Sequence, residues 1–286
     1  MLYDKIVEFY SFVRIKMLNE YVVLENEYLT MKISHIGASI LEVTDFEGNI
    51  LVSRNSGLCF PVCGGVYNNT LTLGESEYSV SENGFLKDCE FILLESYEDY
   101  AEFIFTANED TVKNFPFSFN AIVTYKLLGK AVEINCRIGN FSEYKMPYSF
   151  GINTYFPKGG IDVEFERDEV FEGYIIKNGL FCGDVKRVMP CNGKILNTPE
   201  NGEYVIKNLI SDSFKIIENG KTIAEISKQG FPHFNISSDV YGINFGLWQG
   251  FSGKYGKKDD FVNKDSIKFA DENSSDEYSL IITFNL

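Results

Sequence analysis

Short runs of β-branched and aromatic residues alternate with turn residues along most of the chain, from about residue 20 to the end. Such runs, bounded by glycine, proline, asparagine or aspartate, are typical of strands in an antiparallel all-β fold. The early part of the chain predicts strands at 21–25, 28–34, 40–44 and 50–53. The later part predicts strands at 117–127, 131–138, 214–218, 222–226 and 278–286. The hydrophobic pattern therefore favours a protein built almost entirely from β-sheet.

Turn residues occupy the gaps between these runs. Residues 45–49 read Asp-Phe-Glu-Gly-Asn, and residues 128–130 read Leu-Gly-Lys. Asn219 and Gly220 give the clearest signal, because Asn-Gly readily adopts the positive φ angles of a type I′ turn. We expect hairpins at these places.

Two segments favour helical or irregular structure instead, residues 1–18 and a single turn at 108–114. The polar stretch 252–277 predicts a long surface loop with one short strand near 267–269. No internal repeat and no linker divides the chain, so we expect one domain over 20–286, preceded by an extension at 1–19. That extension is either an extra helix or the product of an upstream start, and the sequence leaves both open.

The composition supports a large packed core. The chain has 286 residues, of which 44 % are hydrophobic and 23 % charged, with 25 Phe and 17 Tyr. This balance excludes a disordered chain, and abundant aromatic residues suit half-buried sheet surfaces.

The net charge narrows the class of binding partner, and the cysteines indicate the cellular location. The formal net charge of -15 repels polyphosphate backbones and anionic membrane surfaces, so we expect neither nucleic acid nor a membrane as partner. The apolar start of the chain is interrupted by Asp4 and Glu8, which a secretory signal tolerates poorly. Six cysteines without C-x-x-C spacing favour reduced thiols and a cytoplasmic location.

Several segments in chain order resemble the aldose 1-epimerase (galactose mutarotase) family, and the lactose-operon mutarotase-like subgroup in particular. They are YLTMKISHIGASILE at 28–42, FPVCGG at 60–65, SENGFLKD at 81–88, NEDTVKNFPFSF at 108–119, YSFGINTYF at 148–156 and FPHFNISSDVYGINFGLWQG at 231–250. The family patterns at four of these places are roughly F-P-I-V-G-R, H-G-F-A-R-D, G-G-H-P-A-F and C-I-E-P-W-x-G.

The resemblance implies a large twisted antiparallel β-sandwich of the galactose mutarotase-like (supersandwich) type, with few short helices. It also implies a small sugar, a hexose or derivative, bound across one concave sheet face. It implies no cofactor and no metal, and we expect a monomer or a homodimer.

The residues that carry the family's chemistry are all replaced. The acid histidine corresponds to Asn153 and the base glutamate, two residues before the tryptophan, corresponds to Gly246. The substrate-contacting histidine corresponds to Asn83 and the arginine to Gly65. Because an amide neither gains nor loses a proton near neutral pH, we expect the epimerase activity to be weak or lost.

Six residues are candidates for binding a sugar, each with a simpler alternative. Asn83 and Asn153 either orient sugar hydroxyls or satisfy backbone groups at strand ends. Lys87 either grips the ligand or is a solvated turn lysine that pairs with Asp88. The sole tryptophan is either a sugar platform or core packing. The full set is Asn83, Lys87, Asn153, Tyr155, Trp248 and Tyr67.

Relocated groups offer a second hypothesis, an active isomerase on an unusual or modified sugar. His233, Asp88 and Glu82 are the candidate catalytic residues for it, although a histidine on an aromatic-rich strand more often packs in the core. A third hypothesis is a protein-interaction or structural role for an aromatic concave face. The sequence contains no glycine-rich phosphate loop, nucleophile elbow or metal-ligand cluster.

Overall fold

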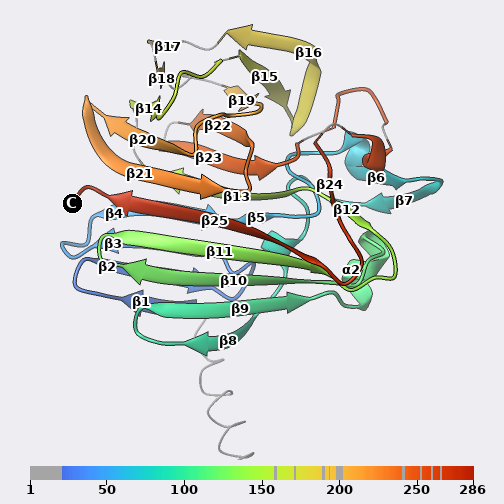
Figure 1. Ribbon diagram of the computed structural model, residues 1–286, viewed down its shortest axis with the longest axis horizontal. Coiled ribbons are helices and arrows are strands. Elements are labelled where there is room, and N and C mark those ends of the chain that lie inside the picture. Colours follow the sequence, from blue (N-terminus) through green and yellow to red (C-terminus); the bar gives the residue numbers. More distant parts are fainter. Residues whose placement is uncertain are drawn as a thin grey trace, which may run out of the picture.

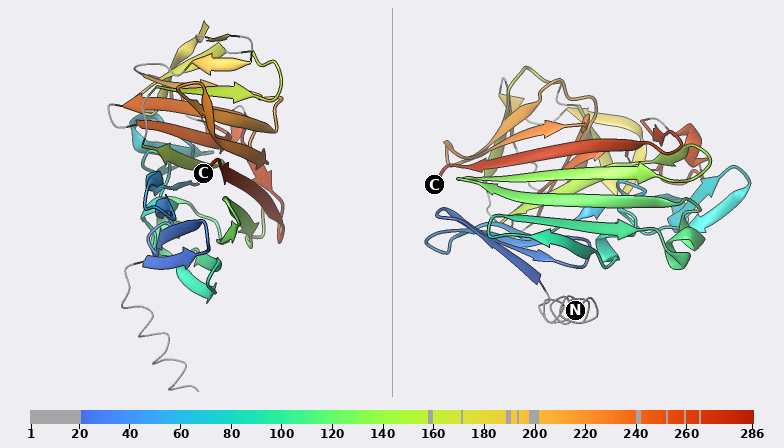
Figure 2. Two further views of the ribbon diagram at one scale, coloured as in Figure 1. Left: turned by 90° about the vertical axis from the view of Figure 1, so that its left-hand side faces the viewer. Right: turned by 60° about the horizontal axis from the view of Figure 1, so that its bottom comes forward.

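Two large antiparallel β-sheets, packed as layers against each other, form the body of the protein (Figure 1, Figure 2). The all-β sandwich expected from the sequence is thereby confirmed. The computed structural model describes residues 21–157, 160–170, 172–188, 191–192, 194–197, 202–239, 242–251, 253–258, 260–264 and 266–286. The extension expected at 1–19 lies outside the described residues.

The first sheet has eleven strands among the described residues, in the order β1-β2-β3-β4-β13-β23-β22-β19-β15-β16, with β5 paired to β13. Their bounds are β1 Tyr21–Glu25, β2 Leu29–Ser34, β3 Ile40–Asp45, β4 Ile50–Ser56, β5 Leu58–Cys59, β13 Phe150–Phe156, β15 Glu172–Lys177, β16 Leu180–Val188, β19 Gly202–Ile206, β22 His233–Asp239 and β23 Gly242–Gln249.

The second sheet has ten strands among the described residues, in the order β17-β18-β14-β20-β21-β25-β11-β10-β9-β8. Their bounds are β8 Ile92–Ser96, β9 Tyr100–Thr106, β10 Phe119–Leu128, β11 Ala131–Asn140, β14 Ile161–Phe165, β17 Cys191–Asn192, β18 Ile195–Asn197, β20 Ser213–Glu218, β21 Lys221–Gln229 and β25 Ser275–Phe284.

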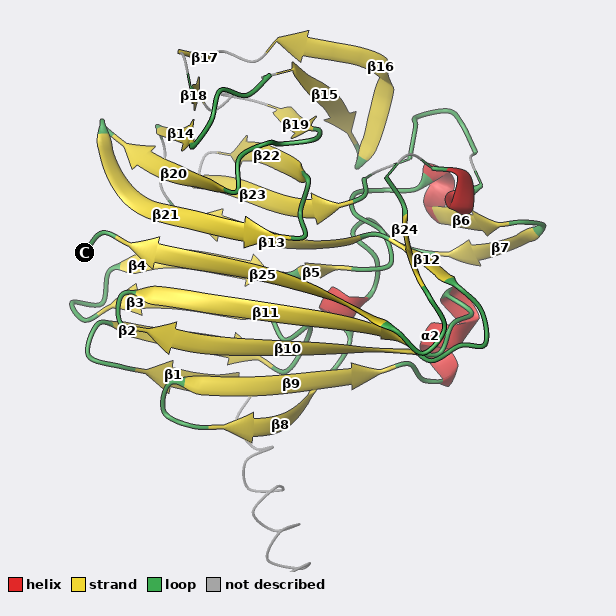
Figure 3. Ribbon diagram, in the orientation of Figure 1, coloured by secondary structure: helices red, strands yellow, loops and turns green. Residues whose placement is uncertain are grey.

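Small elements lie outside the two large sheets, most of them toward one end of the sandwich (Figure 3). They are the hairpin β6 Thr70–Leu73 with β7 Ser76–Ser79, the pair β12 Met146–Tyr148 with β24 Lys268–Ala270, the helix α2 Glu109–Asn114, and the 3₁₀ turns η1 Tyr67–Asn69, η2 Leu86–Asp88 and η3 Phe261–Asn263. Helix α2 begins where Asn108 accepts hydrogen bonds from two backbone amides of the first turn, a capping arrangement that confirms the predicted turn at 108–114. None of the helices in the described part of the chain is long and apolar enough to span a membrane.

The strands predicted from the hydrophobic pattern are present, with shifted ends. The strand expected at 117–127 is β10 Phe119–Leu128, and the last strand begins earlier than expected, at Ser275. Asn219 and Gly220 have φ angles of 50° and 77°, which confirms the predicted turn. The stretch 252–277 contains β24 as expected, but also η3, which begins where Asp260 accepts from the amide of Val262.

The space between the sheets is filled by one continuous cluster of buried aliphatic and aromatic side chains. In β10 every second residue from Phe119 to Leu127 is buried, because successive side chains of a strand point to opposite faces. Phe60 joins the loop after β5 to this core. Its ring lies 4.7–6.1 Å, centroid to centroid, from the rings of Phe85, Phe115, Phe119 and Tyr148.

The central strands of the first sheet are buried on both faces. On β13, Ile152 and Phe156 point into the core between the sheets. The alternate residues Gly151, Asn153 and Tyr155 point the other way, to a surface that we call the outer face. A second, smaller cluster covers part of that face; it consists of Cys59, Cys63, Ile176, Phe181, Val205, Trp248 and Phe251, with Tyr174 packed against it.

Truncation of Phe60 tests the importance of the aromatic core. We expect Phe60→Ala to lower the free energy of unfolding by about 3–5 kcal/mol, because it removes a fully buried ring and leaves a cavity. Phe46→Ala is the matched control, since Phe46 is 71 % exposed, and should change stability by less than about 0.5 kcal/mol. Equal midpoints for the two variants in urea unfolding would contradict this assignment.

Candidate functional site

A band of polar side chains crosses the outer face where β13, β23, β22 and β19 lie side by side. The strand register places Asn153, Gly246 and Asn235 in one row, and Tyr155, Asn244, Ser237 and Glu203 in the next. Because residues directly opposite each other on paired strands have neighbouring side chains, these groups form a continuous surface. We call them the polar band, and define it as Asn153, Tyr155, Glu203, Asn235, Ser237 and Asn244.

The indole of Trp248 fills the place where a side chain at position 246 would lie. A Cβ atom on Gly246 would lie 2.5 Å from Trp248 Nε1, 2.6 Å from Asn153 Oδ1 and 2.9 Å from Asn235 Cβ. Gly151 makes room for the same ring, since a Cβ there would lie 2.5 Å from Trp248 Cδ1. The two glycines therefore form a bed for the indole, which leaves no space for a glutamate at position 246.

Trp248 also determines how Asn153 is used. Its Nε1–H donates a hydrogen bond of 2.9 Å to Asn153 Oδ1, and only 1 % of the tryptophan is exposed. The carbonyl oxygen of Asn153 is thus engaged inside the protein. This geometry favours core packing over a sugar platform as the role of Trp248.

Asn83 and Gly65 hold loops together at the edge of the outer face. Asn83 Oδ1 accepts from the backbone N–H of Gly64 at 2.8 Å, and the N–H of Asn83 donates to the carbonyl of Gly64 at the same distance. Gly65 donates to the carbonyl of Gly179 at 2.6 Å, in the turn between β15 and β16. A Cβ on Gly65 would lie 3.1 Å from that carbonyl oxygen, so a longer side chain would meet the turn. The positions that the resemblance matches to the family's histidine and arginine therefore serve backbone structure.

Two carboxylates, Glu203 and Glu82, lie beside the hairpin of β15 and β16, and Glu203 was not among the predicted residues. Glu203 accepts a hydrogen bond of 2.8 Å from Asn235 Nδ2, while Glu82 packs on the turn at Gly179. Burial raises the pKa of Glu203, and the neighbouring Glu82 raises it further, whereas the hydrogen bond from Asn235 lowers it. Glu203 thus has the features of a group that keeps its proton to higher pH than an ordinary glutamate.

The amides of the polar band are oriented as a chain. Asn244 Nδ2 donates to Asn235 Oδ1 at 3.4 Å, and Asn235 Nδ2 donates in turn to Glu203. Asn235 is only 1 % exposed, so its orientation is set by these partners. The band thereby presents fixed donors and acceptors, which suits recognition of hydroxyl groups.

His233 does not lie open on the outer face. It is fully buried, its ring packs edge-on against Phe251 with centroids 4.9 Å apart, and its Nδ1 accepts from the backbone N–H of Asn208 at 3.2 Å. Beside it, Lys207 Nζ lies 3.6 Å from the ring centroid of Phe251 and 4.5 Å from that of Tyr174, a cation–π arrangement. The geometry gives His233 a packing role, and its predicted catalytic role gains no support.

Lys87 and Asp88 form an ion pair with each other on η2, as one reading of the sequence anticipated. The backbone carbonyl of Lys87 packs against Gly37 in the turn between β2 and β3. No contact joins this pair to the polar band among the described residues. A role for Lys87 in binding the sugar stays a prediction.

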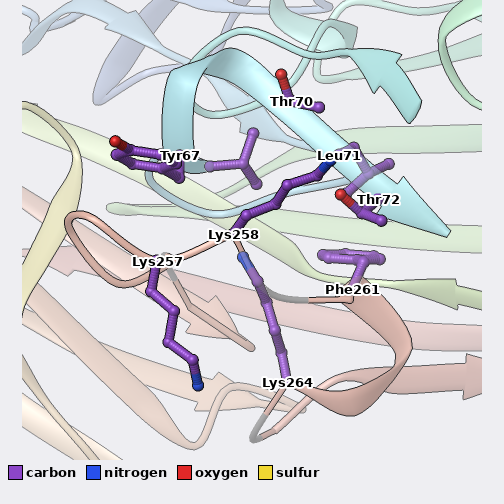
Figure 4. A pocket seen from close by; sticks show the side chains of 9 residues that line it. Tyr67, Thr70, Leu71, Thr72, Lys257, Lys258, Phe261 and Lys264 are labelled. Atoms are coloured by element: carbon purple, nitrogen blue, oxygen red, sulfur yellow. The ribbon is translucent and has the colours of Figure 1, made fainter. Parts of the chain in front are cut away.

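The two remaining candidate residues for sugar binding, Tyr155 and Tyr67, lie in different parts of the structure. Tyr155 lies in the polar band, where its hydroxyl oxygen is 2.9 Å from the place a Cβ on Gly242 would take, and it is 8 % exposed. Tyr67 lies on η1 and lines a small lysine-rich pocket (Figure 4). The pocket has a volume of about 10 Å³, room for one water molecule. Its other lining residues are Val66, Thr70, Leu71, Thr72, Lys257, Lys258, Phe261 and Lys264.

The sequence offered little to identify Glu203 and Asn235. Glu203 is the second residue of the five-residue strand β19, Gly202–Ile206, and a glutamate near the start of a short strand is normally read as solvent-facing. Only the register of β19 against β22 brings the two side chains together. Among the described residues, no group of three histidine, cysteine, aspartate or glutamate side chains could hold a metal ion.

Solved structures share this architecture. A galactose mutarotase-like protein from Lactobacillus casei superposes with a TM-score of 0.85 over 93 % of this chain and 100 % of its own, at 19 % identity. A galactose 1-epimerase from Lactobacillus acidophilus superposes with a TM-score of 0.67 over 93 % of this chain and 94 % of its own, at 10 % identity. The fold is therefore that of the galactose mutarotase-like β-sandwiches.

The sequence model described as aldose 1-epimerase matches residues 20–184, more than half of the chain, and the protein belongs to the aldose 1-epimerase family. Among curated proteins, the plasmid-encoded Protein LacX of Lactococcus lactis subsp. lactis is 26 % identical over 147 residues, which cover 46 % of this chain and 49 % of that protein. Its chromosomal counterpart is 25 % identical over the same length. The chain thus spans about half the length of the curated relatives it matches.

Addition of a single methyl group at position 246 tests whether the indole of Trp248 fills the space beside Gly246. We expect Gly246→Ala to destabilise the protein by about 1–3 kcal/mol, because the new Cβ overlaps Trp248 Nε1 and Asn153 Oδ1. In a Trp248→Phe background, which lacks Nε1, the same change should cost less. A double-mutant cycle from urea unfolding measures this coupling, and additive effects would show that the indole is not the obstacle.

Removal of the Glu203 charge tests its raised pKa. At about pH 4 the carboxyl group is mostly protonated in both the folded and the unfolded state, and it contributes no penalty. As the pH rises through the raised pKa, the wild-type protein loses the stability that the bound proton supplied. We therefore expect the melting temperature of Glu203→Gln, relative to wild type, to increase from about pH 4 to about pH 7. Glu225→Gln, a change at an exposed strand glutamate, should show no such trend.

Proposed function

We propose that the protein binds a small sugar on the outer face and that its ability to interconvert sugar anomers is weak or lost. The observation that supports this most directly is the indole of Trp248 in the space that a side chain at position 246 would need. Family membership supports the sugar as ligand. The oriented amides and the carboxylate of the polar band supply hydrogen-bonding groups for its hydroxyls.

The chemistry of anomer exchange explains why these replacements matter. A base must take the proton of the anomeric hydroxyl, and an acid must protonate the ring oxygen so that the ring opens. Each positioned acid or base contributes roughly 10²- to 10⁴-fold in rate. Asn153 and Gly246 can supply neither transfer, and both positions are committed to the packing of Trp248.

A second candidate function is an active isomerase on an unusual or modified sugar, working with relocated groups. The pair of Glu82 and Glu203 favours it, because carboxylates whose environments differ can act as acid and base.

We also propose a cytoplasmic location and a monomer or homodimer. The location is supported by the free thiols of Cys59, Cys63, Cys89, Cys136 and Cys182.

Binding and turnover are tested on the same protein. D-galactose and D-glucose should give saturation-transfer difference NMR signals and alter the fluorescence of Trp248, the sole tryptophan. Polarimetry on the freshly dissolved α anomers should show a rate about 10²-fold or more below that of an ordinary epimerase assayed in parallel. A rate equal to that enzyme would refute the loss of activity.

A matched pair of variants locates the binding surface. Asn244→Ala removes a donor of the polar band and should weaken sugar binding, whereas Asn120→Ala, at a partly exposed asparagine of the second sheet, should not. Equal binding by both variants would contradict the placement on the outer face.

A further inference from the structure

We propose that Glu203 and Glu82 form a relocated acid/base pair that slowly opens the ring of a neutral reducing sugar lying over the polar band. This inference rests on the proposed sugar binding, and it names the residues that carry the remaining activity. Glu203 is the proton donor and Glu82 the proton acceptor. Neither stands at a position that corresponds to the family's acid, base, histidine or arginine.

The backbone brings the two carboxylates to the same place from distant parts of the chain. Glu203 on β19 is paired with Ile176 on β15, close to the turn between β15 and β16. That turn contains Gly179, whose φ angle is 71°. A Cβ on Gly179 would lie 2.6 Å from Glu82 Cδ and 2.9 Å from each of its carboxylate oxygens. A glycine with positive φ is therefore what lets Glu82 settle against the hairpin beside Glu203.

The environments of the two groups differ in the way an acid and a base require. Glu203 is half-buried and hydrogen-bonded to a buried amide, whereas Glu82 is exposed. Neither carboxylate has an ion-pair partner among the described residues. Burial favours the protonated form of Glu203, whereas solvent reaches the carboxylate of Glu82.

The proton transfers balance without any further reactant. The Glu82 carboxylate takes the proton of the anomeric hydroxyl, and the electron pair of that O–H bond becomes the π bond of the aldehyde. The bond from the anomeric carbon to the ring oxygen breaks, its electrons pass to the oxygen, and Glu203 protonates that oxygen. Rotation about the first C–C bond and reversal of both transfers give the other anomer and restore both carboxyl groups.

The negative charge near the proposed site predicts which class of sugar it can bind. The negative charge of Glu82 repels a uronic acid or a sugar phosphate, whereas a neutral reducing sugar meets no such repulsion. Asn235 and Asn244 place oriented amides beside Glu203 for its hydroxyls.

Three other titratable groups on the surrounding elements contact aromatic rings or the backbone. They are Tyr174 on β15, Lys207 after β19 and His233 on β22. The ammonium group of Lys207 is held on aromatic rings, and His233 is buried with its Nδ1 engaged by the backbone. Glu82 is the charged neighbour that acts on Glu203.

The test compares Glu203→Gln and Glu82→Gln with wild type, and uses Glu225→Gln as an exposed control. The probes are freshly dissolved α-D-galactose and α-D-glucose, followed by polarimetry at several pH values, with binding followed by NMR. We expect each of the two variants to lower the protein-dependent rate by about 10²-fold, down to the solvent background, while sugar binding and folding persist. In wild type the rate should fall on the alkaline side as Glu203 loses its proton. Glu225→Gln should match wild type in every respect.

The outcomes separate this inference from the proposed function. If Glu203→Gln and Glu82→Gln retain the wild-type rate, or if the wild-type protein binds sugar without accelerating anomer exchange at all, the acid/base pair is refuted and sugar binding stands. If D-glucuronate binds as tightly as D-glucose, the assignment to neutral sugars is wrong. If the wild-type protein binds neither hexose, the proposed function itself fails. Circular dichroism and thermal unfolding show whether either variant is misfolded. The kinetic comparison then uses Asn235→Asp, which replaces the amide donor with a negative charge, raises the pKa of Glu203 and should move the alkaline fall of the rate to higher pH; an unmoved profile refutes the role of Glu203.

Discussion

The burial of the central strands of the first sheet on both faces is the constraint on which the rest of the structure depends. Strands β13, β23 and β22 present apolar side chains to the large core on one face; on the other face, Trp248 of β23 belongs to the small cluster that lies beside the polar band. A shift of one residue in register would exchange these two sets, so the pairing is strongly fixed. The polar band exists only because that fixed register aligns asparagines, a serine and a glutamate from four strands.

Much of the fold follows from local signals in the sequence. The long strands of the second sheet alternate cleanly between buried and exposed residues, and their turns carry residues that tolerate positive φ, such as Asn219 and Gly220. The short strands β14 to β19 were not predicted, because each is only two to nine residues long and β15 changes register against β16 near Tyr174. Such strands are determined by their neighbours in space more than by their own sequence.

The candidate site was predictable only in part, for a physical reason. The family resemblance pointed to Asn83, Asn153, Gly65 and Gly246 as places where the family's chemistry is replaced, and that assignment stays a prediction. It gave no information about what fills the space at these positions. The contact of the indole with Asn153 and the packing of Glu82 against Gly179 join residues far apart in the sequence. Such contacts depend on strand order and on the path of loops, which no short motif encodes.

The bed of Gly151 and Gly246 beneath Trp248 has an evolutionary consequence. A mutation that introduces glutamate at position 246 must pass through a protein in which the new side chain and the indole compete for one space. Loss of the indole first would leave Asn153 Oδ1 without its donor inside the sheet, at a cost of about 1–3 kcal/mol. Either order of change crosses a less stable intermediate, so the packing of one ring limits which side chains position 246 can acquire by single mutations.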